Sequence, residues 1–362
     1  MELIRTPIII GGSSVWMGRA IAQRKFVRQI ELQRGMLASE EETWMGLEIR
    51  NPGGPLDLQS IHDIRVNRGA IEQRAATLPG RRSVKGQHQI AWMFQAIRCI
   101  DLTTLAGDDT DERARRLAQK AIRPVRKDLL EAYGIEPNYL HCASVCTYHD
   151  RVAIVESQVK GSGVGVCAVS TGFPAGQIPL DEKLRQIHAS VEAGATEIDI
   201  VVTRPHILAG KWPQLYEEVK AYRGACGEAH LKTILATGDL ATLKQVAQAS
   251  RVCMLAGADF IKTSTGKESV NATIPVGLVM LREIRNHLKM TGAKVGFKAA
   301  GGIGKAKQAV LWLALMKDEL GDDWMQPELF RIGASSLLGD LERQIEFHLT
   351  GRYSAARRHA MA

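Results

Sequence analysis

The amino-acid sequence predicts a (β/α)₈ barrel, or TIM barrel, with an N-terminal helical extension. Eight short apolar runs alternate with longer segments of helical periodicity over about 250 residues of the 362-residue chain, the length typical of this fold. Several runs, such as residues 198–202, are apolar on both faces, as in a parallel sheet that helices cover on both sides. A doubly wound sheet shares this alternation and is the alternative fold.

The predicted elements follow one another in a regular order. The strands are Ala96–Leu102, Tyr139–Thr147, Gly163–Val169, Glu197–Val202, Leu231–Ala236, Phe260–Thr263, Val295–Ala299 and Leu329–Gly333. The helices are Asp111–Tyr133, Leu180–Ala193, Trp212–Glu228, Leu240–Leu255, Val276–Met290, Lys305–Leu320 and Leu337–Leu349. Gly194 and Gly257 each lie between a helix and a strand, where glycine commonly ends a helix in the left-handed conformation. This repetition favours a barrel built from one recurring unit.

Four segments are predicted along the chain. They are an N-terminal appendage of unknown role (1–54), a helical lead-in (55–95), the barrel (96–350) and a basic C-terminal tail (351–362). Gly53, Gly54 and Pro55 mark the first boundary, because glycine and proline interrupt regular structure. The first thirty residues are rich in Arg and Lys and predict a solvated amphipathic helix, with a mitochondrial transit peptide as the alternative. A cytoplasmic location is otherwise expected.

The composition excludes several classes of protein. The formal net charge is +8, but no basic run is interleaved with aromatic residues, which argues against nucleic-acid binding and leaves an anionic metabolite as a partner. No apolar run reaches the roughly 18 residues of a membrane span. The six cysteines form no Cys-x-x-Cys pair and lie mostly in apolar segments, so we expect reduced, buried thiols rather than disulfides.

Two lysines stand at the ends of neighbouring predicted strands. Lys262 follows Phe260 and Ile261, and Lys298 follows Phe297; glycine comes soon after each lysine. A desolvated ammonium group costs several kcal/mol, and the same cost favours the neutral amine that attacks a carbonyl group. If the two lysines meet, repulsion between like charges strengthens this effect. The pair therefore predicts an enzyme that forms a Schiff base.

Catalytic residues of barrels lie at the carboxyl ends of the strands, which collects Asp101, Asp199 and Lys232 beside the two lysines. We expect Asp199 to act as general acid and base, Lys298 to keep Lys262 unprotonated and to join in proton transfer, and Lys232 and Asp101 to balance charge. The alternative is an ion-pair network that only stabilises the barrel.

Small residues follow the last two strands. Gly301 and Gly302 follow the seventh, and Ser335 and Ser336 follow the eighth and open a helix. Loops at these places bind phosphate in many barrels through backbone N–H groups and a helix N-terminus. An N-cap and a plain turn are the alternative. Cys146, just inside the end of the second strand, is expected either to line the mouth or to be a packed thiol.

Metal chemistry has no visible ligands in the sequence. The ten histidines form no His-x-His or His-Glu-x-x-His pattern, which argues against a zinc-dependent aldolase. We therefore expect neither a metal nor an organic cofactor.

Five motifs together resemble the deoxyribose-phosphate aldolase family, most closely its longer, animal-type members. They are Phe-Ile-Lys-Thr-Ser-Thr-Gly-Lys (260–267), Val-Gly-Phe-Lys-Ala-Ala-Gly-Gly (295–302), Glu-Ile-Asp-Ile-Val (197–201), Asp-Leu-Thr-Thr-Leu (101–105) and Gly-Ala-Ser-Ser (333–336). The resemblance extends from about Leu56 to Tyr353.

The resemblance implies a metal-independent class I aldolase that reversibly cleaves 2-deoxy-D-ribose 5-phosphate to D-glyceraldehyde 3-phosphate and acetaldehyde, in deoxyribonucleotide catabolism. It implies Lys262 as the Schiff-base residue, with Asp199 and Lys298 as proton-relay partners. It also implies substrate contacts by the following residues: Thr263, Thr265, Lys267, Gly301, Gly302, Ser335 and Ser336.

Two other functions stay open from the residues themselves. One is a Schiff-base aldolase for a different phosphorylated aldehyde or ketose. The other is a barrel retained as a scaffold, with residues 1–54 as its interaction element. A homo-oligomer is compatible with either reading.

Overall fold

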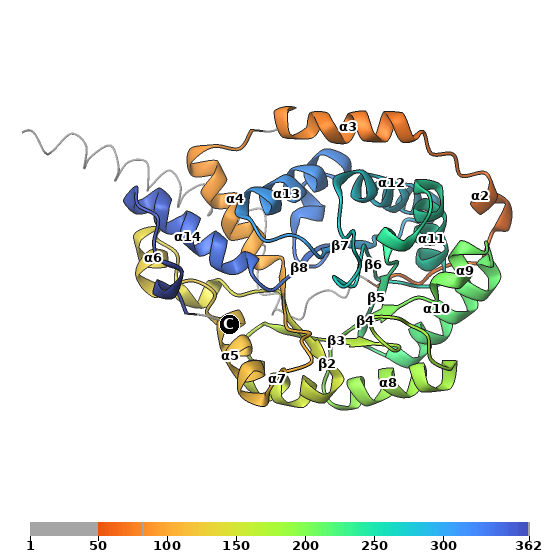
Figure 1. Cartoon of the computed structure of the whole chain (residues 1–362), viewed down its shortest axis with the longest axis horizontal. Coiled ribbons are helices and arrows are strands. Elements are labelled where there is room, and N and C mark those ends of the chain that lie inside the picture. The colour runs from red at the N-terminus through yellow and green to blue at the C-terminus, as the bar shows by residue number, and fades with distance from the viewer. Residues whose placement is uncertain (1–49, 82, 361–362) are drawn as a thin grey trace, which may run out of the picture.

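Eight parallel strands pair in chain order and close into a barrel, with β1 beside β8, in the computed structural model of the chain (Figure 1). The structure describes residues 50–81 and 83–360. The strands are β1 Ile100–Thr103, β2 Ser144–Tyr148, β3 Gly165–Ser170, β4 Glu197–Val201, β5 His230–Ile234, β6 Phe260–Lys262, β7 Gly296–Ala300 and β8 Phe330–Ala334. The predicted (β/α)₈ barrel is therefore confirmed, and the open doubly wound sheet is excluded because β1 and β8 are hydrogen-bonded neighbours.

Helices surround the strands as an outer ring (Figure 1). They are α2 Leu58–His62, α3 Arg68–Arg81, α4 Gly86–Arg98, α5 Asp111–Ile122, α6 Lys127–Ala132, α7 Val152–Val159, α8 Leu180–Glu192, α9 Arg204–Leu208, α10 Trp212–Cys226, α11 Leu243–Leu255, α12 Ile274–Thr291, α13 Ala306–Leu320 and α14 Leu337–Thr350. Of the predicted lead-in, α2 contacts α11, and α3 contacts α12 and α13, as an outer layer over that part of the ring.

Three predicted boundaries were wrong. Ala96 belongs to the buried face of α4, and the first strand begins only at Ile100, because a short apolar run is ambiguous between helix and strand. Pro137 begins a short 3₁₀ turn, so the second strand begins at Ser144 rather than at Tyr139. The single helix predicted over 111–133 is two helices, α5 and α6, because Pro124 disfavours helical geometry in the residue before it.

The two faces of the barrel strands differ in chemistry. Outward-facing side chains such as Ile198, Ile200 and Phe297 are fully buried against the helices and belong to the main hydrophobic core. Phe297 packs on Trp312 of α13, with ring centroids 5.7 Å apart. The inward face instead carries most of the charged residues predicted for the site, so the apolar core lies between strands and helices and leaves the interior for polar groups.

Residues 50–54, the described part of the predicted appendage, lie against the end of the barrel at which β6 begins. Asn51 is buried, and its Nδ2 donates to the carbonyl oxygens of Met254 and Ala258 at 2.7 and 2.8 Å. Its backbone N–H donates to Asp259 Oδ1 at 3.0 Å. This short segment is thus anchored at the base of the strand that carries Lys262. The predicted helix or transit peptide of the first thirty residues lies outside the described residues.

The C-terminal tail packs along α14, with His359 beside Glu342 and Glu346. Tyr353 stacks on Phe347 with centroids 4.4 Å apart, and its hydroxyl accepts a hydrogen bond from Gln344.

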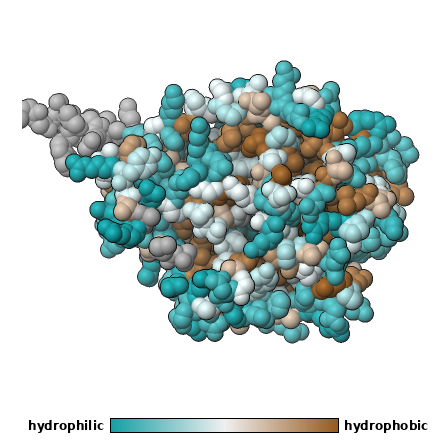
Figure 2. All heavy atoms as spheres, in the orientation of Figure 1, coloured by the Kyte–Doolittle hydropathy of each residue, from teal (hydrophilic) through white to brown (hydrophobic). Residues whose placement is uncertain are grey.

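All six cysteines are free and buried, as predicted. In the described part of the chain no helix is long and apolar enough to cross a membrane, and the face shown in Figure 2 is hydrophilic over most of its area.

Asn51→Ala tests the anchor. The change leaves two buried carbonyl oxygens without their donors, so we expect a loss of about 2–3 kcal/mol in the free energy of unfolding. Asn67→Ala is the control, because Asn67 makes an exposed hydrogen bond to Ala70 N and should cost about 1 kcal/mol. Urea denaturation measures both, and equal losses would show that the Asn51 anchor contributes no more than a surface cap.

Candidate active site

Charged side chains from six strands meet inside the barrel, and the uppermost of them lie near the carboxyl ends of the strands. Asp199 of β4 is at the centre, and its Oδ2 accepts hydrogen bonds from Lys262 Nζ of β6 at 2.6 Å and Lys298 Nζ of β7 at 2.7 Å. Lys262 and Lys298 are register partners on adjacent strands, which places their side chains side by side. Lys298 Nζ also lies 2.5 Å from Asp101 Oδ2 of β1. The predicted meeting of the two lysines is confirmed, and a shared carboxylate joins them.

A second layer of charge lies deeper in the barrel. Arg331 of β8 pairs with Asp101 Oδ1 and with Glu197 Oε1, each at 2.7 Å. Lys232 of β5 pairs with Glu197, and its Nζ lies 3.4 Å from both Asp101 Oδ2 and Asp199 Oδ1. Lys232 and Asp101 are therefore below the mouth, where they connect the deep layer to Asp199 and Lys298.

The protonation of this network follows from its geometry. Burial by itself would raise the pKa of Asp199, but Lys262, Lys298 and Lys232 outweigh burial and hold that pKa well below its usual range. Burial likewise opposes the charge of Lys298, yet Asp101 and Asp199 raise the pKa of its ammonium well above normal. The carboxylates and Lys298 are therefore charged at neutral pH.

The interior cations outnumber the interior anions by one. The cations are Lys232, Lys262, Lys298 and Arg331, and the anions are Asp101, Glu197 and Asp199; all seven are buried. Because an unpaired buried charge is costly, the cluster is balanced when one lysine is neutral. A neutral amine is the form that attacks a carbonyl group.

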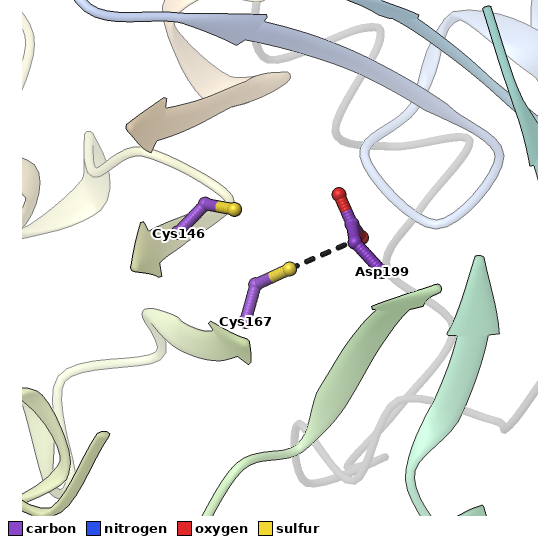
Figure 3. Close-up of side chains that lie close together, drawn as sticks. All are labelled: Cys146, Cys167 and Asp199. Carbon is purple, nitrogen blue, oxygen red and sulfur yellow. Dashed lines mark hydrogen bonds between the residues drawn. The ribbon is translucent and has the colours of Figure 1, made fainter. Parts of the chain in front are cut away.

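Two thiols lie beside Asp199. Cys146 of β2 and Cys167 of β3 are register partners, and both point into the barrel toward Asp199 (Figure 3). Cys167 Sγ donates to Asp199 Oδ1 at 3.1 Å. The hydrogen bond between the two thiols lowers the pKa of Cys146, whereas burial raises the pKa of Cys167. Cys146 is fully buried and packed beside Cys167, the second of the two outcomes expected for it, although its side chain points into the barrel.

Some of the same groups are of types that can bind metal ions. Among the described residues, two sets bring three ligand atoms together: Cys146, Cys167 and Asp199, and Asp101, Cys167 and Glu197. Each carboxylate in them is already bonded to an ammonium or guanidinium group, so a metal cation would be repelled by several nearby positive charges. The donor set does not fit a resident metal ion.

An apolar wall completes one side of the mouth. Leu105 and Val169 pack with the two thiols as a small buried cluster separate from the main core. Tyr148 and Phe173 pack over it, with ring centroids 5.9 Å apart in an edge-to-face arrangement. Apart from Cys146, the members of this wall were not predicted, because they are spread over β2, β3 and the loops after β1 and β3.

The loops after β6, β7 and β8 converge at the mouth. A Cβ atom on Gly266 would lie 3.9 Å from Gly301 Cα, and one on Gly304 would lie 3.3 Å from Ser336 Oγ. Gly301 and Gly302 have positive φ angles of 80° and 79°, which L side chains rarely adopt. Ser335 and Ser336 are exposed, and Ser336 is the N-cap of α14 with no side-chain capping bond. These loops offer backbone N–H groups and a free hydroxyl to an anion.

The other three predicted substrate contacts form hydrogen bonds within the protein. Thr263 Oγ1 donates to Ala300 O, at 3.2 Å, between β6 and β7, so this hydroxyl ties the strands together rather than facing the mouth. Thr265 bonds to Glu268 within its own turn. Lys267 Nζ donates to Leu105 O at 3.0 Å, which brings the loops after β6 and β1 together.

Three residues of the cluster were not among the predicted site residues: Glu197, Arg331 and Cys167. Glu197 precedes Asp199 by two residues, so strand periodicity places both on one face, and this signal was present. Arg331 is the second residue of β8, where a buried cation requires an interior anion. Cys167 gave no signal, because an isolated cysteine in an apolar strand is usually only packed.

The chain was compared with known proteins. Residues 95–340 match the model of the DeoC/LacD family aldolases. Deoxyribose-phosphate aldolase of Bos taurus is 54% identical over 305 residues, covering 84% of this chain and 96% of the relative. That of Homo sapiens is 53% identical over 311 residues, covering 85% and 98%. The tetrameric deoxyribose phosphate aldolase of Aeropyrum pernix has the same fold, with a TM-score of 0.52 at 23% identity, over 73% of this chain and 98% of that one. The chain belongs to the DeoC/LacD aldolase family.

Proposed function

We propose that the protein is a deoxyribose-phosphate aldolase that reversibly cleaves 2-deoxy-D-ribose 5-phosphate to D-glyceraldehyde 3-phosphate and acetaldehyde through a Schiff base on Lys262. The observation that carries this proposal is the pair of buried lysines bonded to one carboxylate oxygen. The high identity to animal deoxyribose-phosphate aldolases supports the choice of substrate. Borohydride trapping with this substrate tests it.

Lys262 is the nucleophile in this proposal because, of the three lysines in the barrel interior, it is the least held by carboxylates. Its Nζ is bonded to Asp199, whereas Lys298 and Lys232 are each held by Asp101 as well. The neutral amine of Lys262 attacks C1 of the open-chain sugar, and loss of water gives an iminium ion. The iminium accepts the electron pair of the C2–C3 bond as that bond breaks.

Two proton movements accompany carbon–carbon cleavage. The C3 hydroxyl loses a proton as D-glyceraldehyde 3-phosphate leaves, and C2 of the remaining enamine gains one before hydrolysis releases acetaldehyde. Asp199 and Lys298 share a hydrogen bond of 2.7 Å next to Lys262, so they can pass a proton between the substrate and the network. Cys146 and Cys167 provide a compact wall beside the two-carbon fragment.

The phosphate group is assigned to the loops after β6, β7 and β8. Lys267, Gly301, Gly302, Ser335 and Ser336 offer one cation, backbone N–H groups and hydroxyls around the place where these loops converge. A different phosphorylated aldehyde would use the same loops, and substrate profiling distinguishes the two. We propose that the reaction needs neither a metal nor an organic cofactor. We also propose that the protein is a homo-oligomer and is located in the cytoplasm.

Borohydride trapping tests the nucleophile. Reduction in the presence of deoxyribose 5-phosphate should leave a two-carbon or sugar adduct on Lys262, identified by peptide mass mapping. Lys262→Leu should lower turnover by roughly 10⁴-fold or more with the fold intact, because no other amine reaches the same place. Lys244→Leu, on α11 in the outer ring of helices, should change neither trapping nor turnover. An adduct on Lys298 or Lys232 would overturn the assignment.

Lys298 is tested by the pH dependence of trapping. Lys298→Met removes the second cation from Asp199 Oδ2, so the carboxylate holds the Lys262 ammonium more strongly. We expect less trapped imine at neutral pH and an alkaline shift of the profile by roughly one to two pH units. Lys298→Arg keeps the charge but gives up no proton, so it should preserve the profile while turnover falls. An unshifted profile for Lys298→Met would limit Lys298 to later proton transfers.

Ser336→Asp tests the phosphate site. Aspartate is as good an N-cap as serine, so α14 should be preserved, while its charge repels the substrate phosphate. The KM for deoxyribose 5-phosphate should rise about tenfold or more, a cost of about 1.4 kcal/mol, and that for unphosphorylated deoxyribose should not change. Equal effects on both substrates would place the phosphate elsewhere.

A further inference from the structure

The turn after β6 already holds an anion that belongs to the protein itself. Glu268 Oε2 accepts hydrogen bonds from Thr265 N at 3.0 Å, from Gly266 N at 3.2 Å and from Thr265 Oγ1 at 2.8 Å. Gly266 has a positive φ of 88°, which turns successive N–H groups toward one point. Such a concave arrangement of backbone donors, called a nest, binds anions. The Glu268 carboxylate therefore occupies an anion-binding nest.

This nest adjoins the loops assigned to the substrate phosphate. Gly266, which supplies one of its donors, lies beside Gly301 of the loop after β7. The next residue, Lys267, is the cation of the proposed phosphate site. The Glu268 carboxylate and a substrate phosphate cannot both accept hydrogen bonds from the same three donors, and two anions at neighbouring sites repel each other. A phosphate group that binds the N–H groups of this turn must displace Glu268.

The backbone of the turn has little freedom to move aside. A Cβ on Gly238 would lie 1.9 Å from Val270 O, and one on Gly301 would lie 2.6 Å from Asn271 Oδ1, so the turn is wedged between two loops that glycine alone lets approach so closely. Asn271 Nδ2 also donates to Glu268 O at 3.0 Å. The Glu268 side chain is only half-buried, and its neighbours Gly266 and Lys267 are exposed. Displacement therefore requires rotation of that one side chain toward solvent.

We propose that Glu268 is an internal competitor for the substrate phosphate, a residue that sets how strongly the enzyme prefers phosphorylated over unphosphorylated sugars. This inference rests on the proposed function, because it takes the phosphate site at these loops as its starting point. Glu268 weakens phosphate binding through competition for the nest and through repulsion. It makes no contact with the Lys262, Asp199 and Lys298 cluster among the described hydrogen bonds and ion pairs, so it leaves the chemistry on the sugar carbons unaffected.

Glu268→Gln is the central experiment. Glutamine keeps the length and one acceptor oxygen of the side chain, so the turn is retained, but the competing charge is gone. We expect inorganic phosphate, titrated by calorimetry, to bind the Glu268→Gln variant about tenfold more tightly than the wild-type protein. The reason is that hydrogen bonds to the charged Glu268 are about twice as strong as those to a neutral glutamine. The KM for deoxyribose 5-phosphate should fall by a similar factor, with kcat and the KM for deoxyribose unchanged.

Two further variants make the outcome decisive. Asp108→Asn removes an exposed charge from the loop after β1 without touching the nest, and it should leave phosphate binding unchanged. Glu268→Ala removes both acceptors; competition predicts tighter phosphate binding for it too, whereas a purely structural cap predicts a higher KM for both sugars. Unchanged or weaker phosphate binding in Glu268→Gln would overturn the inference. Failure of the unchanged protein to cleave deoxyribose 5-phosphate would instead overturn the proposed function, and calorimetry with inorganic phosphate would still test the nest.

Discussion

The shared carboxylate of Asp199 is the interaction on which the site depends. Its Oδ2 binds Lys262 and Lys298 together, and its Oδ1 accepts from Cys167. Without this anion, two buried ammonium groups would face each other at a cost of several kcal/mol. The carboxylate instead keeps both amines in place. The interior still holds four cationic side chains and only three anionic ones. The arrangement thus holds two lysine side chains side by side on one buried carboxylate.

The deep layer supports this arrangement from below. Arg331 forms ion pairs with Glu197 and with Asp101. Burial by itself would raise the pKa of Glu197, but Arg331 and Lys232 outweigh it and lower that pKa to about 2, so Glu197 is charged. Asp101 then contacts Lys298 from the same layer. Removing one member would leave an unpaired charge inside the barrel, which is more costly than replacing the whole network by apolar groups. The deep layer therefore fixes the charge of Lys298.

The strand that carries Lys262 is held at both ends. Its base, at Asp259, binds Asn51 of the N-terminal segment and Arg223 of α10. Its upper end continues into the turn that glycine contacts wedge between the neighbouring loops. A strand of three residues has few ladder hydrogen bonds of its own, so these contacts outside the sheet position the amine. In the same turn, the Glu268 nest connects the placement of Lys262 to the proposed recognition of phosphate.

The sequence by itself determined the barrel, because alternation of apolar strands and helical segments is a local pattern that few other folds share. It also determined which strands carry Lys262, Lys298 and Asp199, since strand ends can be read from neighbouring glycines. The tertiary structure decided what these residues touch. Closure of the barrel brings Arg331 of the last strand to Asp101 of the first, 230 residues away, and no local pattern encodes such a pair. It also turned Thr263 toward Ala300 and placed Glu268 in its nest, because side-chain direction depends on how neighbouring loops pack.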